Sequence, residues 1–140
     1  MIITNGDNSY PAAWPWIIDL NIGKYYSSYV GNYQGKYGKG AGNGDKQNRF
    51  FPSAGNHDHA QYSNLVRLFG LEPITLQPYL DYFTLPGKGF ANTSGNERYY
   101  DFVYNFKGVS VHFFALNSDQ YGLESDGVDK NSKHPKKEMV

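Results

Sequence analysis

The sequence predicts an α/β protein with a mixed β-sheet layered with helices. Two short apolar segments, residues 1–4 and 49–53, each run into a glycine-containing loop, and apolar residues at helical spacing follow each loop. Near the end, residues 100–106 and 109–115 alternate between apolar and more polar side chains. Alternation is typical of strands, and recurrence every three to four residues is typical of helices. A chain that combines both patterns favours an α/β layer fold.

The N-terminal part predicts one strand, one helix and one long loop. Residues 1–4 are apolar and β-branched and meet Asn-Gly-Asp-Asn, which is typical of a strand that ends in a loop. A buried parallel strand seldom opens a domain, so we also expect sequence to be missing before it. Pro15 suits the first turn of a helix, and the apolar stripe after it predicts a helix over about residues 16–30. Residues 31–48 show no period and predict a surface loop.

The middle of the chain predicts a second strand, loop and helix. Residues 49–53 form a short strand that runs into Gly-Asn-His-Asp. Apolar residues within 62–69 form a second helical stripe, and Gly70 suits its C-terminal stop. Residues 78–83 predict one helical turn, and the glycine-rich residues 86–96 predict a loop.

The C-terminal part predicts a β-hairpin followed by a polar segment. The alternating residues 100–106 and 109–115 are separated by Lys-Gly, which is typical of a hairpin turn. Residues 120–140 are polar and lysine-rich, so we expect a flexible segment there. The expected organisation is therefore one partial domain over residues 1–119, with a flexible C-terminal segment over 120–140.

Composition excludes several classes of partner. The chain has 140 residues, with 13 Lys and Arg against 13 Asp and Glu, so its formal net charge is zero. No basic surplus favours nucleic acid or an anionic membrane surface. The absence of cysteine excludes disulfides and thiolate metal ligands. No apolar run is long enough for a transmembrane helix, and the N-terminus lacks the pattern of a signal peptide.

Two loops share a design that suits a metal centre. The sequence GDNSY at residues 6–10 and the sequence GNHD at residues 55–58 each follow a predicted strand. Ligands of α/β folds bind outside the carboxyl ends of strands, so we expect both loops on one rim. A carboxylate there can bridge two cations, an amide oxygen is a neutral ligand, and an imidazole can protonate a leaving group. Asp58 could orient the imidazole of His57.

These loops resemble the signatures of a known enzyme family. GNHD matches the GNH[DE] signature of calcineurin-like metallophosphoesterases, and GDNSY resembles the GDxxY form of their GD motif in purple acid phosphatases. The segments 49–53, 96–102 and 111–118 also look like the family, and the resemblance covers most of residues 2–119. It implies a partial metallophosphoesterase sandwich.

The resemblance also implies roles for four residues. Asp7 would bridge two metal ions, Tyr10 would ligate the first, which is ferric iron in purple acid phosphatases, and Asn56 would ligate the second. His57 would contact the phosphate and assist the leaving group. The implied cofactors are two metal ions, iron with zinc, manganese or a second iron. The implied reaction is hydrolysis of a phosphate-ester substrate by a metal-bound hydroxide.

The sequence departs from the family at both ends of the site. The Asp-x-His or Asp-x-Gly element that precedes the GD loop is absent, because only six residues precede Asp7. The later Gly-His-x-His element is also absent, since His134 lies in Ser-Lys-His-Pro. We therefore expect a fragment with an incomplete site that is inactive alone. The resemblance allows a secreted or periplasmic parent protein and leaves the compartment, substrate and oligomeric state open.

Each motif also has an interpretation without chemistry. Residues 5–8 could form only a turn, and Tyr10 could serve packing or surface roles. His59 is expected to be solvated at a helix start, and His112 to be packed or hydrogen-bonded within a strand. The alternative function is a non-catalytic binding module in which a tyrosine-rich loop at 25–37 binds sugar or protein, and a third alternative is a truncated product without function. Because the two loops share one design, we favour the metal interpretation.

Overall fold

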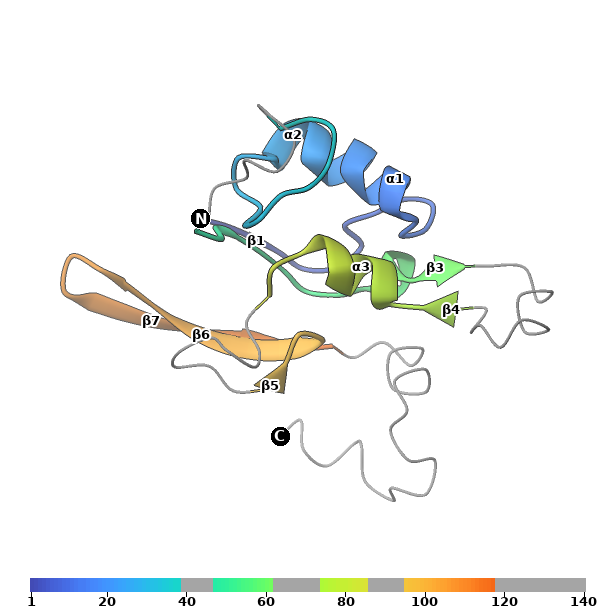
Figure 1. The fold of residues 1–140 in the computed structure, drawn as a ribbon. Coiled ribbons are helices and arrows are strands. Elements are labelled where there is room, and N and C mark those ends of the chain that lie inside the picture. The colour runs from blue at the N-terminus through green and yellow to red at the C-terminus, as the bar shows by residue number, and fades with distance from the viewer. Residues whose placement is uncertain (39–46, 62–73, 86–94, 118–140) are drawn as a thin grey trace, which may run out of the picture.

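The computed structural model describes residues 1–38, 47–61, 74–85 and 95–117. These residues form three small sheets with helices above them (Figure 1). The strands are β1 (Ile2–Thr4), β2 (Phe50–Pro52), β3 (Ala60–Gln61), β4 (Ile74–Thr75), β5 (Gly95–Asn96), β6 (Tyr99–Phe106) and β7 (Val109–Ala115). The α/β character expected from the sequence is confirmed. Instead of one mixed sheet, however, the described residues form one parallel pair and two antiparallel sheets.

The parallel pair of β1 and β2 positions the two loops of interest. Ile2 pairs with Phe50, and Thr4 pairs with Pro52, in line with the two strands expected there. The backbone N–H of Ser53 donates to the carbonyl oxygen of Thr4 at 3.0 Å, which extends the pairing to the strand ends. Because parallel strands end at the same edge, the loops that follow them lie side by side.

The helix expected over residues 16–30 is shorter and is interrupted by a π-turn. It consists of α1 (Pro15–Ile18), the π-helical turn η1 (Asp19–Gly23) and α2 (Lys24–Tyr26). A π-turn adds a residue to the helical repeat, so the apolar stripe cannot continue on one face. Ile18 and Ile22 are buried as expected, whereas Tyr25 is exposed.

Asp19 explains why the helix ends early. Its buried carboxylate accepts hydrogen bonds from the hydroxyl groups of Tyr33 at 2.5 Å and Tyr82 at 2.9 Å, and from the backbone N–H of Lys36 at 3.1 Å. The chain must leave the helix before Tyr33 to bring these donors back to Asp19. A stretch expected to be a surface loop is therefore anchored in the interior at Tyr33.

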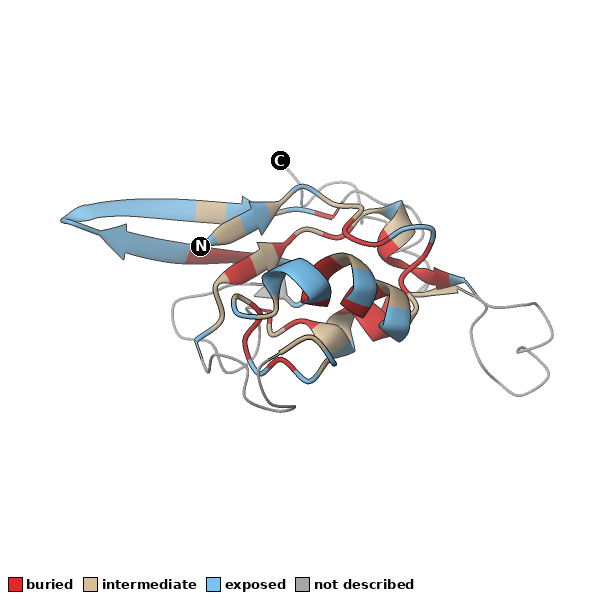
Figure 2. Ribbon diagram, turned by 90° about the horizontal axis from the view of Figure 1, so that it is seen from above, coloured by how far each residue is buried: buried red, intermediate tan, exposed pale blue. Residues whose placement is uncertain are grey.

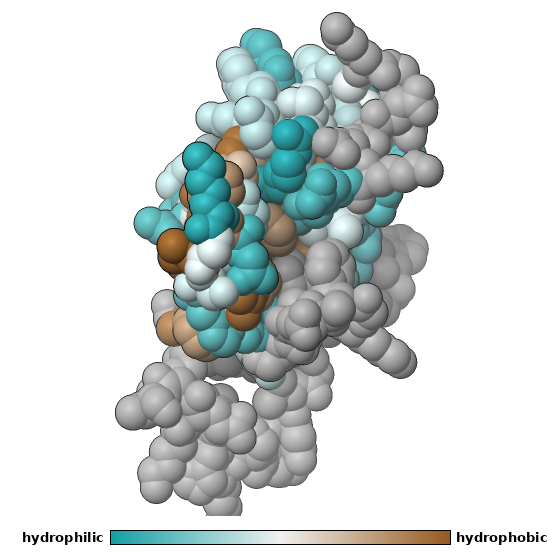
Figure 3. Space-filling model, turned by 90° about the vertical axis from the view of Figure 1, so that its left-hand side faces the viewer, coloured by the Kyte–Doolittle hydropathy of each residue, from teal (hydrophilic) through white to brown (hydrophobic). Residues whose placement is uncertain are grey.

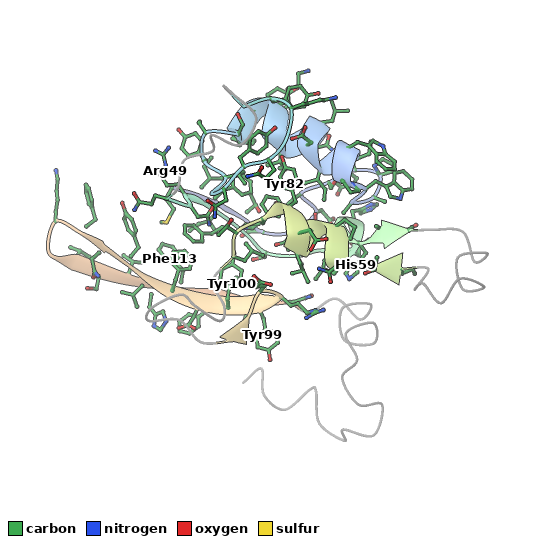
Figure 4. All side chains as sticks on the ribbon, viewed as in Figure 1. Arg49, His59, Tyr82, Tyr99, Tyr100 and Phe113 are labelled. Carbon is green, nitrogen blue, oxygen red and sulfur yellow. The ribbon has the colours of Figure 1, made fainter. Side chains whose placement is uncertain are left out.

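An aromatic core surrounds β2. The helix α3 (Gln77–Tyr82), which includes most of the expected turn at 78–83, packs beside this strand, and the ring of Phe83 stacks on Phe50 with centroids 5.5 Å apart. The hydroxyl groups of Tyr79 and Tyr100 both donate to the carbonyl oxygen of Pro52, at 2.7 and 2.8 Å. Tyr100 reaches this oxygen from β6, below the core (Figure 4).

The expected β-hairpin is confirmed, but only its base is packed. Strands β6 and β7 pair from Tyr100 and Ala115 out to Phe106 and Val109. The turn residues Lys107 and Gly108 both have positive φ, which matches the twist of a two-residue hairpin. Figure 2 shows the change from buried residues at the base to exposed residues along the rest of the hairpin. The expected loop at 86–96 ends in β5, because Asn96 pairs with Tyr99.

Several expectations concern residues that the structure does not describe. The helical stripe within 62–69 and its stop at Gly70 lie outside the described residues, as do residues 86–94, His134 and the segment 120–140. The proposed domain limits thus stay a prediction. Among the helices that are described, none is long and apolar enough to span a membrane.

Candidate functional site

Two glycines let the loops after β1 and β2 approach each other closely. Gly6 has a φ of 104°, and a Cβ atom added there would lie 3.3 Å from the Cα atom of Gly55. Asp7 has a φ of 52°, in the left-handed region that aspartate tolerates better than most residues. This backbone geometry turns the Asp7 side chain toward the GNHD loop.

The Asp7 carboxylate is the point where the loops meet. Its Oδ1 atom accepts a hydrogen bond from the backbone N–H of His57 at 3.1 Å. Its Oδ2 atom accepts one from the hydroxyl group of Tyr10 at 3.0 Å. The rings of Tyr10 and His57 are also in contact, with centroids 4.4 Å apart. Three of the four residues singled out from the sequence are therefore in mutual contact.

Gly55 is required for this contact, a role that was not assigned from the sequence. A Cβ atom at Gly55 would lie 2.4 Å from the Oδ1 atom of Asp7 and 2.6 Å from its backbone nitrogen. Such separations are too short for non-bonded atoms. Any side chain at this position would therefore displace Asp7.

Tyr10 presents its hydroxyl group at the surface of the site. Its side chain is 54% exposed. The hydrogen bond to the Asp7 carboxylate raises the pKa of the Tyr10 hydroxyl, and partial burial and the charges of Asp7 and Asp58 raise it further. The phenol is thus held in its neutral form unless a cation offsets the neighbouring negative charge.

The orientation of His57 is set by a partner that the sequence did not indicate. Its Nδ1–H donates to the carbonyl oxygen of Pro11 at 2.8 Å. The neutral ring then carries its lone pair on Nε2. Asp58, which we expected to orient this imidazole, instead makes its hydrogen bonds to Asn8 and Gly55.

Asp58 is a buried clamp between the loops. Its carboxylate accepts hydrogen bonds from the backbone N–H and the side-chain amide of Asn8, at 2.8 and 2.9 Å, and from the N–H of Gly55 at 2.9 Å. Burial raises the pKa of the Asp58 carboxyl to about 6, although these hydrogen bonds act in the opposite direction. The hydroxyl group of Thr4 also donates to the Asn8 side chain.

Asn56 stands beside the contacting residues without being buried. It opens the 3-10 turn η2 (Asn56–Asp58), and its side chain is exposed. Within the described ranges, no three His, Cys, Asp or Glu side chains form a group that could hold a metal ion. The set Asp7, Tyr10 and Asn56 contains one such side chain, so phenol and amide oxygens would have to supply the other described ligands.

The structure contradicts the expectation for His59 and confirms the expectation for His112. His59, expected to be solvated, is fully buried, so that expectation is wrong. The cause is that the chain turns extended at His59, directly after η2, and runs beside residues 11–14, where the N–H of Ala13 donates to the carbonyl oxygen of His59 at 3.1 Å (Figure 4). His112 contacts Asp101 through Nε2 at 2.5 Å, which confirms a hydrogen-bonded role.

The tyrosine-rich loop of the alternative function is partly buried. Tyr33 is buried and bonded to Asp19, and Tyr29 and Tyr37 pack against the core. Tyr25 and Tyr26 remain exposed. This arrangement does not favour the loop over the site at Asp7.

Comparisons with protein-family models, with curated proteins and with solved structures found no match. The functional assignment therefore depends on the residues themselves. Their contacts bring Asp7, Tyr10 and His57 together at the edge of the parallel pair.

Proposed function

We propose that the chain forms part of the catalytic domain of a two-metal phosphoesterase that resembles the purple-acid-phosphatase branch of the calcineurin-like metallophosphoesterases. On this proposal the α/β arrangement is the N-terminal part of that family's sandwich. The observation that carries the proposal is the convergence on Asp7, whose two carboxylate oxygens contact the His57 backbone and the Tyr10 hydroxyl group. A simple turn at residues 5–8 would not need both partners.

The oxygen atoms at the site are of the chemical types that bind hard metal ions. The Oδ2 atom of Asp7 and the hydroxyl oxygen of Tyr10 lie 3.0 Å apart, so one cation could replace the proton between them. Carboxylate, phenolate and amide oxygens suit hard cations such as ferric iron or manganese. When bound, the two metal ions would supply the Lewis acidity for phosphate-ester hydrolysis. Asp7, Tyr10 and Asn56 carry too little negative charge for two cations, so we expect the chain alone to bind metal weakly and to show no turnover.

His57 fits the role of a proton donor to the leaving group. The Pro11 carbonyl oxygen holds the proton on Nδ1, so donation to the leaving group uses the doubly protonated ring and transfers the proton on Nε2, which leaves the neutral ring with its lone pair there. The ring lies against Tyr10 and close to Asp7 without using a ring nitrogen to contact that carboxylate. The His57 ring can therefore interact with the substrate while the carboxylate and phenol oxygens remain available as metal ligands.

Iron titration of the chain tests the proposal without requiring turnover. Ferric iron bound to a phenolate gives a visible charge-transfer band. We expect the band to appear in the wild-type chain at high iron concentration, and to be lost in Tyr10→Phe and in Asp7→Ala. His57→Ala should keep it, because His57 is assigned to the phosphate.

The matched control is Tyr25→Phe, which removes the hydroxyl group of another exposed tyrosine, 65% exposed against 54% for Tyr10, from the helical run. This variant should keep the band. Absence of a band in the wild-type chain would contradict the proposal, and so would a band that survives in Tyr10→Phe. Two tightly held metal ions per chain would overturn the assignment of an incomplete site.

A further inference from the structure

Two stacked indole rings, one half-buried and one exposed, lie close to the candidate site. The ring centroids of Trp14 and Trp16 are 5.7 Å apart, and the ring planes are inclined by only 14°. Trp16 is 62% exposed, and Leu20, one turn along the helix, is also exposed. Indole has a large apolar surface, so the exposed Trp16 ring leaves apolar area in contact with water.

Three hydrogen bonds connect residues 11–14, which include Trp14, to residues 57–61. Pro11 accepts a hydrogen bond from His57, Ala13 donates to His59, and the indole N–H of Trp14 donates to the carbonyl oxygen of Gln61 at 3.2 Å. The segment that orients the His57 ring therefore also positions Trp14. Residues 57–61 span at most about 13 Å when extended, so the indole pair lies within reach of a ligand held at His57.

We propose that Trp16, supported by Trp14, binds the planar aromatic ring of a phosphate ester in which a short spacer separates ring and phosphorus, as in a nucleoside monophosphate. The inference rests on the proposed function and names its substrate class. The indole N–H of Trp14 is already used by Gln61, so the pair offers flat π faces. Stacking on such faces selects for flat aromatic rings and accepts rings that carry different substituents. The spacer would bridge the separation between Trp14 and His57, which the chain from His57 to Gln61 limits to about 13 Å.

Tryptophan fluorescence provides a selective measurement. The chain has two tryptophans in total, and both belong to this pair. Adenosine 5′-monophosphate and adenosine should quench the emission saturably, whereas ribose 5-phosphate, which has the spacer and phosphate without the ring, should not. Absence of saturable quenching by both ring-containing probes would overturn the inference, and equal quenching by ribose 5-phosphate would do the same.

A matched pair of variants locates the binding. By ligand-observed NMR, Trp16→Ala should weaken adenosine 5′-monophosphate binding by roughly tenfold or more. Tyr25→Ala, which removes another exposed ring from the same helical run, should leave it unchanged. Thermal unfolding of both variants checks that each remains folded, and Trp16→Phe, which keeps a flat ring, should restore most of the affinity. Unchanged affinity in a folded Trp16→Ala would reject the assignment.

The two proposals fail in different ways. If adenosine quenches and Trp16→Ala abolishes its binding, the ring platform is supported even when iron gives no band with Tyr10. If the iron band depends on Tyr10 and neither ring-containing probe quenches, the metal site stands and the platform is rejected.

Discussion

Residues from both loops position the Asp7 carboxylate. The positive φ of Gly6 and Asp7 turns the loop, and Gly55 leaves the room that the carboxylate occupies. Strained or left-handed backbone of this kind is often retained where a side chain must be aimed at a ligand. The site therefore depends on small residues that carry no chemistry themselves.

Gly55→Ala should disrupt the site at Asp7. The added Cβ atom would meet the Oδ1 atom of Asp7 at 2.4 Å, so the carboxylate must move away from His57 and Tyr10. We expect the iron–phenolate band to be lost. The measurement is the same titration used for Tyr10, together with thermal unfolding.

Gly108→Ala is the matched control for this substitution. Gly108 also has positive φ, but a Cβ atom there would meet no other atom within 4 Å. A side chain in left-handed backbone costs about 1–2 kcal/mol, so this variant should lose stability yet keep the band. Retention of the band in Gly55→Ala would show that Asp7 does not need the position it occupies.

Sequence reasoning at this scale predicted that the two loops meet and missed the groups that hold them together. The proximity of Asp7 and His57 could be predicted because both residues follow glycines at the ends of strands expected on one rim. The Pro11 carbonyl that orients His57 could not, because a backbone acceptor leaves no signal in residue type. The clamp between Asn8 and Asp58 was equally hidden, since it joins residues far apart in sequence.

Among the elements, the hairpin β6–β7 combines two environments along its length. At the base, Phe102 stacks between Phe51 and Phe113, with centroid separations of 4.1 and 5.1 Å. At the tip, the cross-strand pair of Phe106 and Val109 is 57% and 61% exposed. Figure 3 views the molecule from the side of the hairpin tip and shows apolar side chains at the surface there.

Polar substitutions at the tip and truncations at the base should have opposite consequences. Replacing Phe106 and Val109 together by threonine should leave the free energy of unfolding within about 1 kcal/mol and reduce self-association, because exposed apolar strands promote edge pairing. Phe102→Ala should cost about 3–5 kcal/mol. Thermal unfolding and light scattering measure the two effects. Strong destabilisation by the tip variant would mean that this surface is buried in solution.

The helical run shows why element boundaries were harder to predict than element types. The spacing of Ile18 and Ile22 correctly indicated a helix with a buried side. The π-turn begins at Asp19, whose carboxylate accepts hydrogen bonds from Tyr33 and Tyr82, which are distant in sequence. A pattern limited to neighbouring residues cannot contain that interaction.

At the scale of the whole molecule, stability depends on buried tyrosine hydroxyl groups. Tyr33 and Tyr82 share the Asp19 carboxylate, and Tyr79 and Tyr100 share the Pro52 carbonyl oxygen. Burial, together with the hydrogen bond to Asp19, raises the pKa of Tyr33 to about 12. Burial also raises the pKa of the other three hydroxyl groups. The folded chain thus holds these phenols in their neutral form.

Alkaline conditions should therefore destabilise the protein. The pKa of these phenols is higher in the folded chain than the value of 10.0 for an unperturbed tyrosine. Their contribution to stability is complete below pH 10 and is lost as the pH rises through the folded pKa, since the unfolded chain then releases protons more readily. We expect a lower unfolding temperature at pH 11 than at pH 8.

Variants at tyrosine separate this effect from general alkaline repulsion. Tyr82→Phe removes one partly buried hydroxyl group with a raised pKa, so its unfolding temperature should depend less on pH between 8 and 11. Tyr25→Phe removes an exposed hydroxyl group and should behave like the wild type. Equal pH dependence in all three proteins would show that the buried phenols do not titrate on unfolding.

The parallel pair of β1 and β2 also determines when the site can exist. Ile2 pairs with Phe50, a separation of 48 residues along the chain, and the pair is only three residues long. Closing a loop of that length costs roughly 3 kcal/mol of chain entropy, which the hairpin, with its two-residue turn, avoids. The hairpin can therefore form while Asp7 and His57 are still apart. A circular dichroism signal from strands would then not report an assembled site, whereas the contact between His57 and Asp7 would appear only after this long-range closure.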